Sequence, residues 1–185
     1  MIHVVGLGGV GFWLTVGLTR LMPPDQIQCW DDDTLAGGLG ASRLPWGPAS
    51  TKKVELLTGY LSMVFGDRIL PQVVDRKFSG TLGVTEGDTI IDCTDMPITA
   101  RKRMWGVSKG KGAKLIRVSY DGQGSTVLVS TGLPLLATTT GGYAAVPSLA
   151  LSLAAGGIGA EAVKRYLDTH QDHFTFTFSV EGALQ

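Results

Sequence analysis

The glycines and acidic residues near the start of the chain have the types and spacing of a site that binds a nucleotide. An acidic cluster begins at Asp31, about 20 residues past the last of four glycines. The four are Gly6, Gly8, Gly9 and Gly11. In a nucleotide-binding βαβ unit, such glycines allow a sharp turn, let the backbone approach a phosphate and let the next helix pack close to the sheet. A carboxylate at the end of the second strand then accepts hydrogen bonds from ribose hydroxyls. The spacing therefore predicts nucleotide binding, and the alternative is a glycine turn needed only for packing.

The periodicity of the apolar residues predicts the elements that would position this site. Patterns typical of strands cover residues 2–5, 26–30, 69–74, 89–93, 114–120, 125–130 and 174–178. Helical periodicity covers residues 10–21, 52–65, 98–108 and 143–167. This alternation indicates an α/β fold: a doubly wound, Rossmann-like, mostly parallel sheet with an antiparallel C-terminal addition. We expect one domain over residues 1–185, with a functional loop over the site at residues 35–50.

The composition argues against several classes of partner and location. The chain has 16 basic and 16 acidic residues, so its zero net charge favours neither nucleic acid nor an anionic membrane. The apolar stretch over residues 143–163 is rich in small residues, and it predicts a buried helix rather than a membrane span. No basic region precedes the first apolar run, which argues against a signal peptide. Cys29 and Cys93 lie in strand patterns without a CxxC pair, so we expect core thiols, no disulfide and a cytoplasmic location.

The order of the polar residues resembles the pattern of a known family. After the doubled glycine Gly8-Gly9 and the acidic cluster, the chain presents Arg43, then Lys53, then a strand pattern that leads to Asp95. In this order the chain resembles the ThiF/MoeB family, the adenylating core shared with ubiquitin-activating enzymes. That family has a GxGGxG loop, an Asp-x-Asp cluster, an Asn-Leu-x-Arg-Gln loop, a lysine at a helix start and a strand that ends in an aspartate. The resemblance covers nearly the whole chain.

The resemblance implies a role for each matching residue. Asp31 would hold the ribose, with Asp33 as a second acid in the same turn. Arg43 and Lys53 would offset the negative charge of the triphosphate and of the leaving pyrophosphate. Asp95 would hold Mg²⁺. The implied reaction is the attack of a carboxylate on the α-phosphorus of ATP, which gives an acyl-adenylate.

Simpler interpretations exist for three of these residues. A shift of one position within the acidic cluster would give the role of Asp31 to Asp32. Lys53 and its neighbour Lys52 are also typical of a surface pair at a helix start. Asp95 would equally suit a cap for the helix that follows it.

The chain departs from the family in ways that bear on function. The family's asparagine–arginine loop is reduced to residues 38–44, and the arginine that usually follows the aspartate strand would have to be Arg101, displaced by an insertion. Zinc-binding cysteine pairs are missing after Val129, and residues 130–142 hold no cysteine for a thioester. Cys93, beside the expected site, is expected to be a core thiol. We therefore expect adenylation without thioester chemistry, or a degenerate member that binds nucleotide without turnover.

Three functions remain open from the sequence. The favoured one is ATP- and Mg²⁺-dependent adenylation of a carboxylate, with the C-terminus of a small ubiquitin-like or sulfur-carrier protein as the expected substrate. The second is a catalytically weak partner subunit that acts as a scaffold, and the third is an NAD-dependent oxidoreductase that rests on the glycine motif alone.

The late helical pattern also predicts a partner subunit. Residues 143–167 are apolar around most of the helix, and four small residues would allow close approach of another backbone. The four are Ala150, Ala154, Gly157 and Ala160. The chain starts at its first strand, without the N-terminal helix that in relatives can supply an arginine across a dimer. We therefore expect a homodimer or a dimer with a homologous subunit.

Overall fold

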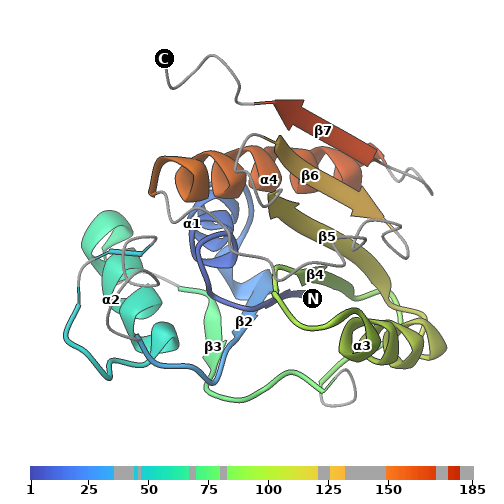
Figure 1. The fold of residues 1–185 in the computed structure, drawn as a ribbon, viewed down its shortest axis with the longest axis horizontal. Coiled ribbons are helices and arrows are strands. Elements are labelled where there is room, and N and C mark those ends of the chain that lie inside the picture. The colour runs from blue at the N-terminus through green and yellow to red at the C-terminus, as the bar shows by residue number, and fades with distance from the viewer. Residues whose placement is uncertain are drawn as a thin grey trace.

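The computed structural model describes eight stretches of the chain, which together contain one seven-stranded sheet with helices on both faces (Figure 1). The described residues are 1–35, 44–45, 47–66, 70–79, 83–120, 126–131, 149–169 and 175–179. The strands are β1 (Ile2–Val5), β2 (Ile27–Trp30), β3 (Gln72–Val74), β4 (Thr89–Asp92), β5 (Lys114–Tyr120), β6 (Thr126–Thr131) and β7 (Thr175–Ser179). The helices are α1 (Gly11–Leu21), α2 (Lys53–Phe65), α3 (Ile98–Gly110) and α4 (Leu149–Thr169).

The strand order of this sheet is β3-β2-β1-β4-β5-β6-β7. Pairs from β3 through β5 are parallel, and β5–β6 and β6–β7 are antiparallel. The prediction of a doubly wound, mostly parallel sheet with an antiparallel C-terminal addition is therefore confirmed. Val5 lies opposite both Trp30 and Asp92, so the carboxyl ends of β1, β2 and β4 meet at one edge. In open α/β sheets, the point where the strand order reverses, here between β1 and β4, is where ligands bind.

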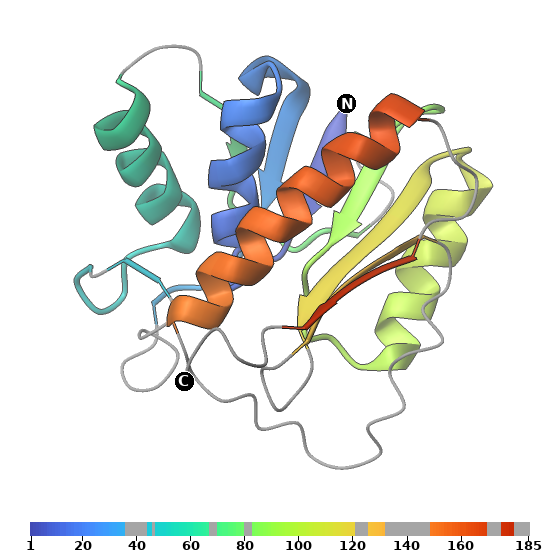
Figure 2. The same cartoon turned by 90° about the horizontal axis from the view of Figure 1, so that it is seen from above.

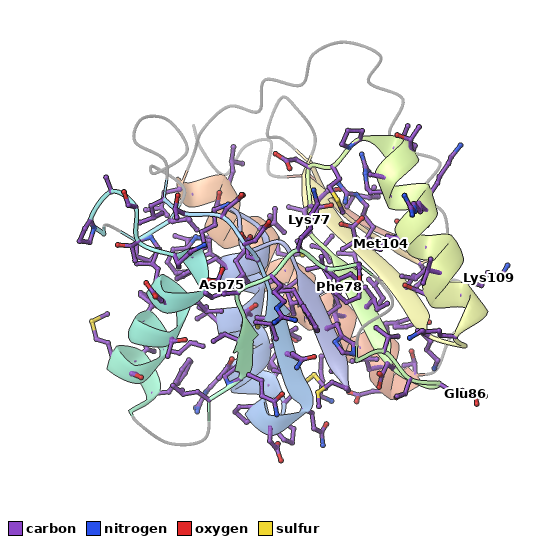
Figure 3. The ribbon with its side chains drawn as sticks, turned by 90° about the horizontal axis from the view of Figure 1, so that it is seen from below. Asp75, Lys77, Phe78, Glu86, Met104 and Lys109 are labelled. Atoms are coloured by element: carbon purple, nitrogen blue, oxygen red, sulfur yellow. The ribbon has the colours of Figure 1, made fainter. Side chains whose placement is uncertain are left out.

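Both faces of the central strands are buried, as parallel strands require. The face that carries Val4 and Ile91 packs with residues of α1, α2 and α4. The opposite face carries Val5 and Ile90, and α3 covers it (Figure 2). On that side Phe78, from the segment after β3, and Met104, from α3, lie in one apolar cluster, whereas Lys109 points away from the molecule (Figure 3).

Helix α4 packs against α1 of the same chain through its small residues. A side chain added at Gly156 would overlap Trp13 of α1, and a Cβ at Gly17 would lie 2.7 Å from the Cβ of Ala160. The helix also meets the sheet, because a Cβ at Gly159 would lie 2.6 Å from Cγ1 of Val118. Close helix packing of this kind depends on the missing side chains.

This packing within the chain uses only some of the four small residues that the sequence predicts at a close contact. Ala160 is buried against α1, Ala154 is half-buried, and Ala150 and Gly157 are exposed, so a close approach of another backbone at these last two stays a prediction. Part of the apolar surface is covered within the chain by α1, while Leu149 and Leu153 remain 43% exposed. The predicted helix began at residue 143, and residues 143–148 lie outside the described part of the chain.

Several predicted boundaries also shift. Gln26 belongs to a short 3₁₀ turn, Pro24–Gln26, instead of β2, and α3 continues to Gly110. β4 ends at Asp92, so Cys93 follows the strand. β3 begins at Gln72, so residues 70 and 71 of the predicted third strand are not part of it. Residue 69 of that prediction and residue 174, the predicted start of the last strand, lie outside the described residues. Across the described part of the chain, no helix has both the length and the apolar character needed to cross a membrane.

Candidate nucleotide-binding site

The loop between β1 and α1 is a tight glycine turn at the carboxyl edge of the sheet. Gly6 has φ +88°, in the left-handed region that favours glycine, and its N–H donates to the carbonyl of Trp30 at 2.9 Å. A side chain at Gly11 would overlap the carbonyl oxygen of Gly6, so α1 starts in direct contact with the turn. The sharp turn and the close helix packing that the spacing predicts are therefore present.

Gly8 differs from Gly6 and Gly11 because, its chain neighbours aside, no atom of the described residues lies within 4 Å of the position that its Cβ would take. The open space lies beside the first turn of α1, where free backbone N–H groups and the helix dipole favour an anion. A phosphate could approach the backbone there, whereas a side chain would occupy the same space. Gly9 lies in the same loop. The contribution of these two glycines to nucleotide binding stays a prediction.

Asp31, directly after β2, ties the glycine loop to the neighbouring strand. Its Oδ2 accepts the N–H of Leu7 at 2.5 Å, and its Oδ1 accepts the N–H of Asp33 at 2.8 Å. Burial raises the pKa of Asp31, and the charge of Lys53 and the two backbone N–H groups oppose that rise. Asp31 is only 8% exposed, and each of its two carboxylate oxygens accepts a backbone N–H of its own surroundings, from Leu7 or Asp33.

The other two residues of the acidic cluster, Asp32 and Asp33, are exposed. The three carboxylates lie close enough for oxygens of all three to fall within 4.8 Å of one another. The structure thus brings together the two acids expected at the ribose, with Asp31 turned inward and Asp33 turned outward.

Lys53, the first residue of α2, lies against this cluster. Its Nζ is 2.7 Å from Oδ2 of Asp33 and 3.8 Å from Oδ1 of Asp31, and its side chain is 17% exposed. Lys52 has different partners: its Nζ lies 3.2 Å from a carboxylate oxygen of Asp75 and donates to the carbonyl of Asp32. The two lysines therefore do not form an equivalent surface pair, because only Lys53 joins the two acids of the expected site.

Asp95 lies in the loop between β4 and α3, at the same edge of the sheet. Its side chain is exposed. The N-cap of α3 is Pro97, and no side chain hydrogen-bonds to cap the helix, so the alternative of Asp95 as a helix cap is wrong. A carboxylate that projects from this loop fits Mg²⁺, which usually takes one or two carboxylates together with phosphate oxygens. The metal role of Asp95 stays a prediction.

A buried ion pair next to this loop was not expected from the sequence. Asp92, the last residue of β4, has no exposed surface, and its Oδ2 lies 2.9 Å from a terminal guanidinium nitrogen of Arg117 on β5. Its Oδ1 accepts both the N–H of Thr94 at 2.9 Å and its hydroxyl at 2.6 Å. The signal that could have found the pair is the register of the parallel strands, in which Asp92 lies opposite Arg117.

Arg101, the residue considered as the displaced family arginine, lies beside this pair. Its Nε donates to the carbonyl of Met96 at 2.7 Å. Burial and then the charge of Arg117 lower the pKa of Arg101, while Asp92 and Asp95 oppose that shift. Arg101 therefore belongs to the charged group around the Asp95 loop.

The remaining predictions near the site concern Arg43 and the cysteines. Arg43 and most of the predicted functional loop, residues 36–43 and 46, lie outside the described part of the chain. Both cysteines are free. Burial raises the pKa of Cys29 to about 12, and burial and the charge of Asp92 raise the pKa of Cys93. Neither thiol is set up as a thiolate nucleophile at neutral pH, in agreement with the expectation of core thiols.

Comparison with known proteins shows a fold shared with solved structures. No family model matches the sequence, and no curated protein matches it. Among solved structures, E. coli MccB with ATP superposes with a TM-score of 0.73 at 12% identity, over 97% of this chain and 60% of MccB. MccB with AMPCPP and MccA gives a TM-score of 0.74 at 13% identity, over 97% and 60% of the two chains.

A third solved structure matches this chain over most of its own length. The E. coli tRNA N6-threonylcarbamoyladenosine dehydratase TcdA superposes with a TM-score of 0.66 at 14% identity, over 91% of this chain and 86% of TcdA. The chain described here spans about three fifths of the length of MccB. At these identities the likeness shows the fold, and the fold is the Rossmann-like fold of MccB and TcdA.

Proposed function

We propose that this chain binds ATP at the edge formed by β1, β2 and β4 and uses it to adenylate a carboxylate. The observation that carries the proposal is the open position at Gly8 beside the start of α1, with Lys53 at the start of α2 and Asp95 in the loop after β4, both at the same edge of the sheet. The resemblance to the ThiF/MoeB family supports it independently. Structures of this fold that contain ATP and AMPCPP support it as well.

In the proposed reaction, a carboxylate oxygen attacks the α-phosphorus of ATP. The bond from the α-phosphorus to the oxygen that bridges to the β-phosphate breaks, and pyrophosphate leaves with that electron pair. The protein mainly positions the reactants and offsets negative charge. Lys53 and Arg43 would supply fixed positive charge at the triphosphate, and the cluster of Asp31 and Asp33 would face the ribose. Mg²⁺, held by Asp95, would add charge neutralisation at the phosphates.

The proposed substrate is the C-terminus of a small ubiquitin-like or sulfur-carrier protein, in a cytoplasmic setting. One MccB structure contains both AMPCPP and MccA, which supports a second molecule together with the nucleotide. The chain spans only about three fifths of MccB, so the substrate of MccB does not identify the carboxylate that this chain would adenylate.

ATP–pyrophosphate exchange with candidate carrier proteins tests the function. We expect exchange that depends on the carrier's C-terminal carboxylate and on Mg²⁺, and that disappears in Lys53→Ala. Calorimetry with Mg-ATP and NAD⁺ serves as the companion measurement, with tighter binding of Mg-ATP expected. ATP binding without exchange would favour the scaffold alternative, and tighter binding of NAD⁺ would overturn the adenylation proposal.

We also propose that the chain works as a symmetric dimer or with a homologous subunit. The exposed Leu149 and Leu153 at the start of α4 support an interface near this helix. Light scattering at micromolar concentration is the test, with a dimer mass expected. A monomer that adenylates at full rate without a partner would contradict the proposal.

A further inference from the structure

The loop that carries Asp95 is held at both ends by arginines. At its start, Arg117 pairs with Asp92, and Asp92 holds the N–H and hydroxyl of Thr94. Near its end, Arg101 binds the carbonyl of Met96. Asp95 lies between these two anchors and is exposed. Fixing both sides of a short loop limits where its tip can lie.

The same contacts reach the glycine turn. The position that a Cβ on Gly6 would take lies 3.0 Å from Cγ2 of Thr94, and the N–H of Cys93 donates to the carbonyl of Val5 at 2.9 Å. Thr94 is thus held by Asp92 on one side and packs against the turn on the other. Any change in the direction of the Asp92 carboxylate would move Thr94 and, with it, the relation between the glycine turn and the Asp95 loop.

Arg117 is the partner that orients the Asp92 carboxylate, with a terminal guanidinium nitrogen 2.9 Å from Oδ2. Asp92 has no exposed surface, and a buried carboxylate without a cation is strongly disfavoured. Arg117 comes from the neighbouring strand β5, directly opposite Asp92, and is itself 9% exposed. Its connection to the site is therefore through Asp92 and Thr94.

We propose that Arg117 is a positioning residue of the nucleotide site, which sets the placement of Asp95 relative to the Gly6 turn through Asp92 and Thr94. The proposal rests on the proposed function, because it assigns Arg117 to the Mg-ATP site. It predicts that loss of the Asp92–Arg117 pair weakens the binding of ATP with Mg²⁺ more than the binding of ATP alone, since the metal is the group that Asp95 would hold. A pair that serves only stability would affect both forms of ATP alike.

The test compares both ends of β4. The double variant Asp92→Asn/Arg117→Gln removes the pair without leaving one buried charge alone. Its matched control is Asp88→Asn, which alters the buried carboxylate just before the first residue of the same strand. Calorimetry gives Kd for ATP with and without Mg²⁺, and thermal melts give stability.

We expect the double variant to weaken Mg-ATP binding at least tenfold and metal-free ATP binding less than threefold. Asp88→Asn should lower the melting temperature and leave the ratio of the two Kd values within twofold of the wild type. If the double variant does not fold, two variants of Thr94 replace it. Thr94→Val has nearly the same shape but lacks the hydroxyl that Asp92 holds, and it should change the ratio of the two Kd values. Thr94→Ser keeps the hydroxyl, and its ratio should stay near that of the wild type.

The outcomes separate this proposal from the function on which it rests. An unchanged Kd ratio in these variants, in a protein that catalyses exchange, overturns the positioning role alone. A wild type that binds Mg-ATP without exchange overturns adenylation, and the Kd ratio still decides the role of Arg117. A wild type that does not bind Mg-ATP overturns both.

Discussion

A side chain at Gly11 would overlap the carbonyl oxygen of Gly6, so the turn after β1 and the start of α1 are in backbone contact. The carbonyl of Gly8 already accepts the N–H of Phe12 at 3.1 Å, as the first turn of the helix requires. The turn therefore presents the N-terminus of α1 toward the open space beside Gly8. This geometry underlies the first prediction.

Gly8→Ala should weaken ATP binding without unfolding the protein. Apart from its chain neighbours, the added methyl group meets no atom of the described residues within 4 Å, so the melting temperature should stay near that of the wild type, but the methyl group would occupy the phosphate position. We expect at least a tenfold increase in Kd for Mg-ATP by calorimetry. Gly59→Ala in α2, also open, is the control and should stabilise by up to about 1 kcal/mol. Equal ATP affinity in Gly8→Ala would place the phosphate elsewhere.

Lys53→Ala and Lys52→Ala should differ sharply in nucleotide binding. Lys53 lies against the carboxylates of Asp31 and Asp33, whereas Lys52 pairs with Asp75 and contacts only the backbone carbonyl of Asp32 in the acidic cluster. Loss of the Lys53 charge should raise Kd for Mg-ATP at least tenfold, and loss of Lys52 should change it less than twofold. Titration calorimetry on both variants measures this. Similar effects of the two substitutions on Kd would show that Lys53 has no specific role in binding the nucleotide.

Asp95→Ala should remove the Mg²⁺ dependence of ATP binding and leave the fold intact. The side chain is exposed and does not cap α3, so its loss should change the free energy of unfolding by less than about 0.5 kcal/mol. Thermal melts with ATP, with and without Mg²⁺, check both parts. In the wild type Mg²⁺ should add to the stabilisation by ATP, and in the variant it should not. An unchanged response to Mg²⁺ would remove Asp95 from the metal site.

Asp88→Asn should destabilise the protein at neutral pH, and the difference should shrink in acid. Burial alone would raise the pKa of Asp88, but the N-terminal amino group, the N–H and hydroxyl of Thr85, and His3 together hold it below its ordinary value of 3.8. The charged carboxylate therefore contributes stability above pH 3.8, which is lost as the pH falls through the lower folded-state value.

We expect Asp88→Asn to lose about 1–3 kcal/mol at pH 7. Urea unfolding between pH 7 and pH 2.5 measures the difference from the wild type. Asp25→Asn, at an exposed position, is the control and should follow the wild type at every pH. A difference that stays constant down to pH 2.5 would show that the charge of Asp88 is not the stabilising feature.

The order of elements and the glycine turn could be predicted because both depend on local sequence. Apolar periodicity is set by neighbours a few positions apart, and the roles of Gly6 and Gly11 follow from one short loop. Asp31 was placed correctly at the end of β2 by the same local spacing. Its inward direction was not predictable, since that depends on the N–H groups of Leu7 and Asp33.

The features that the sequence did not predict depend on contacts between distant segments. The pair of Asp92 and Arg117 requires the register of β4 against β5, which no local pattern specifies. The residues that bring α4 close to α1, Gly156 among them, are determined by which face of the helix meets Trp13. Local periodicity indicates that a helix has small residues, but the partner helix selects which of them lie at the contact.

The packing of Gly156 on Trp13 also affects how the chain acquires its structure during synthesis. Helix α1 leaves the ribosome early, and the helix that covers it is the last one among the described residues. Until α4 has been made, the surface of α1 around Trp13 lacks its cover, and the two helices can meet only by closing a long stretch of chain. Nascent chains that lack α4 should therefore be aggregation-prone and bind chaperones.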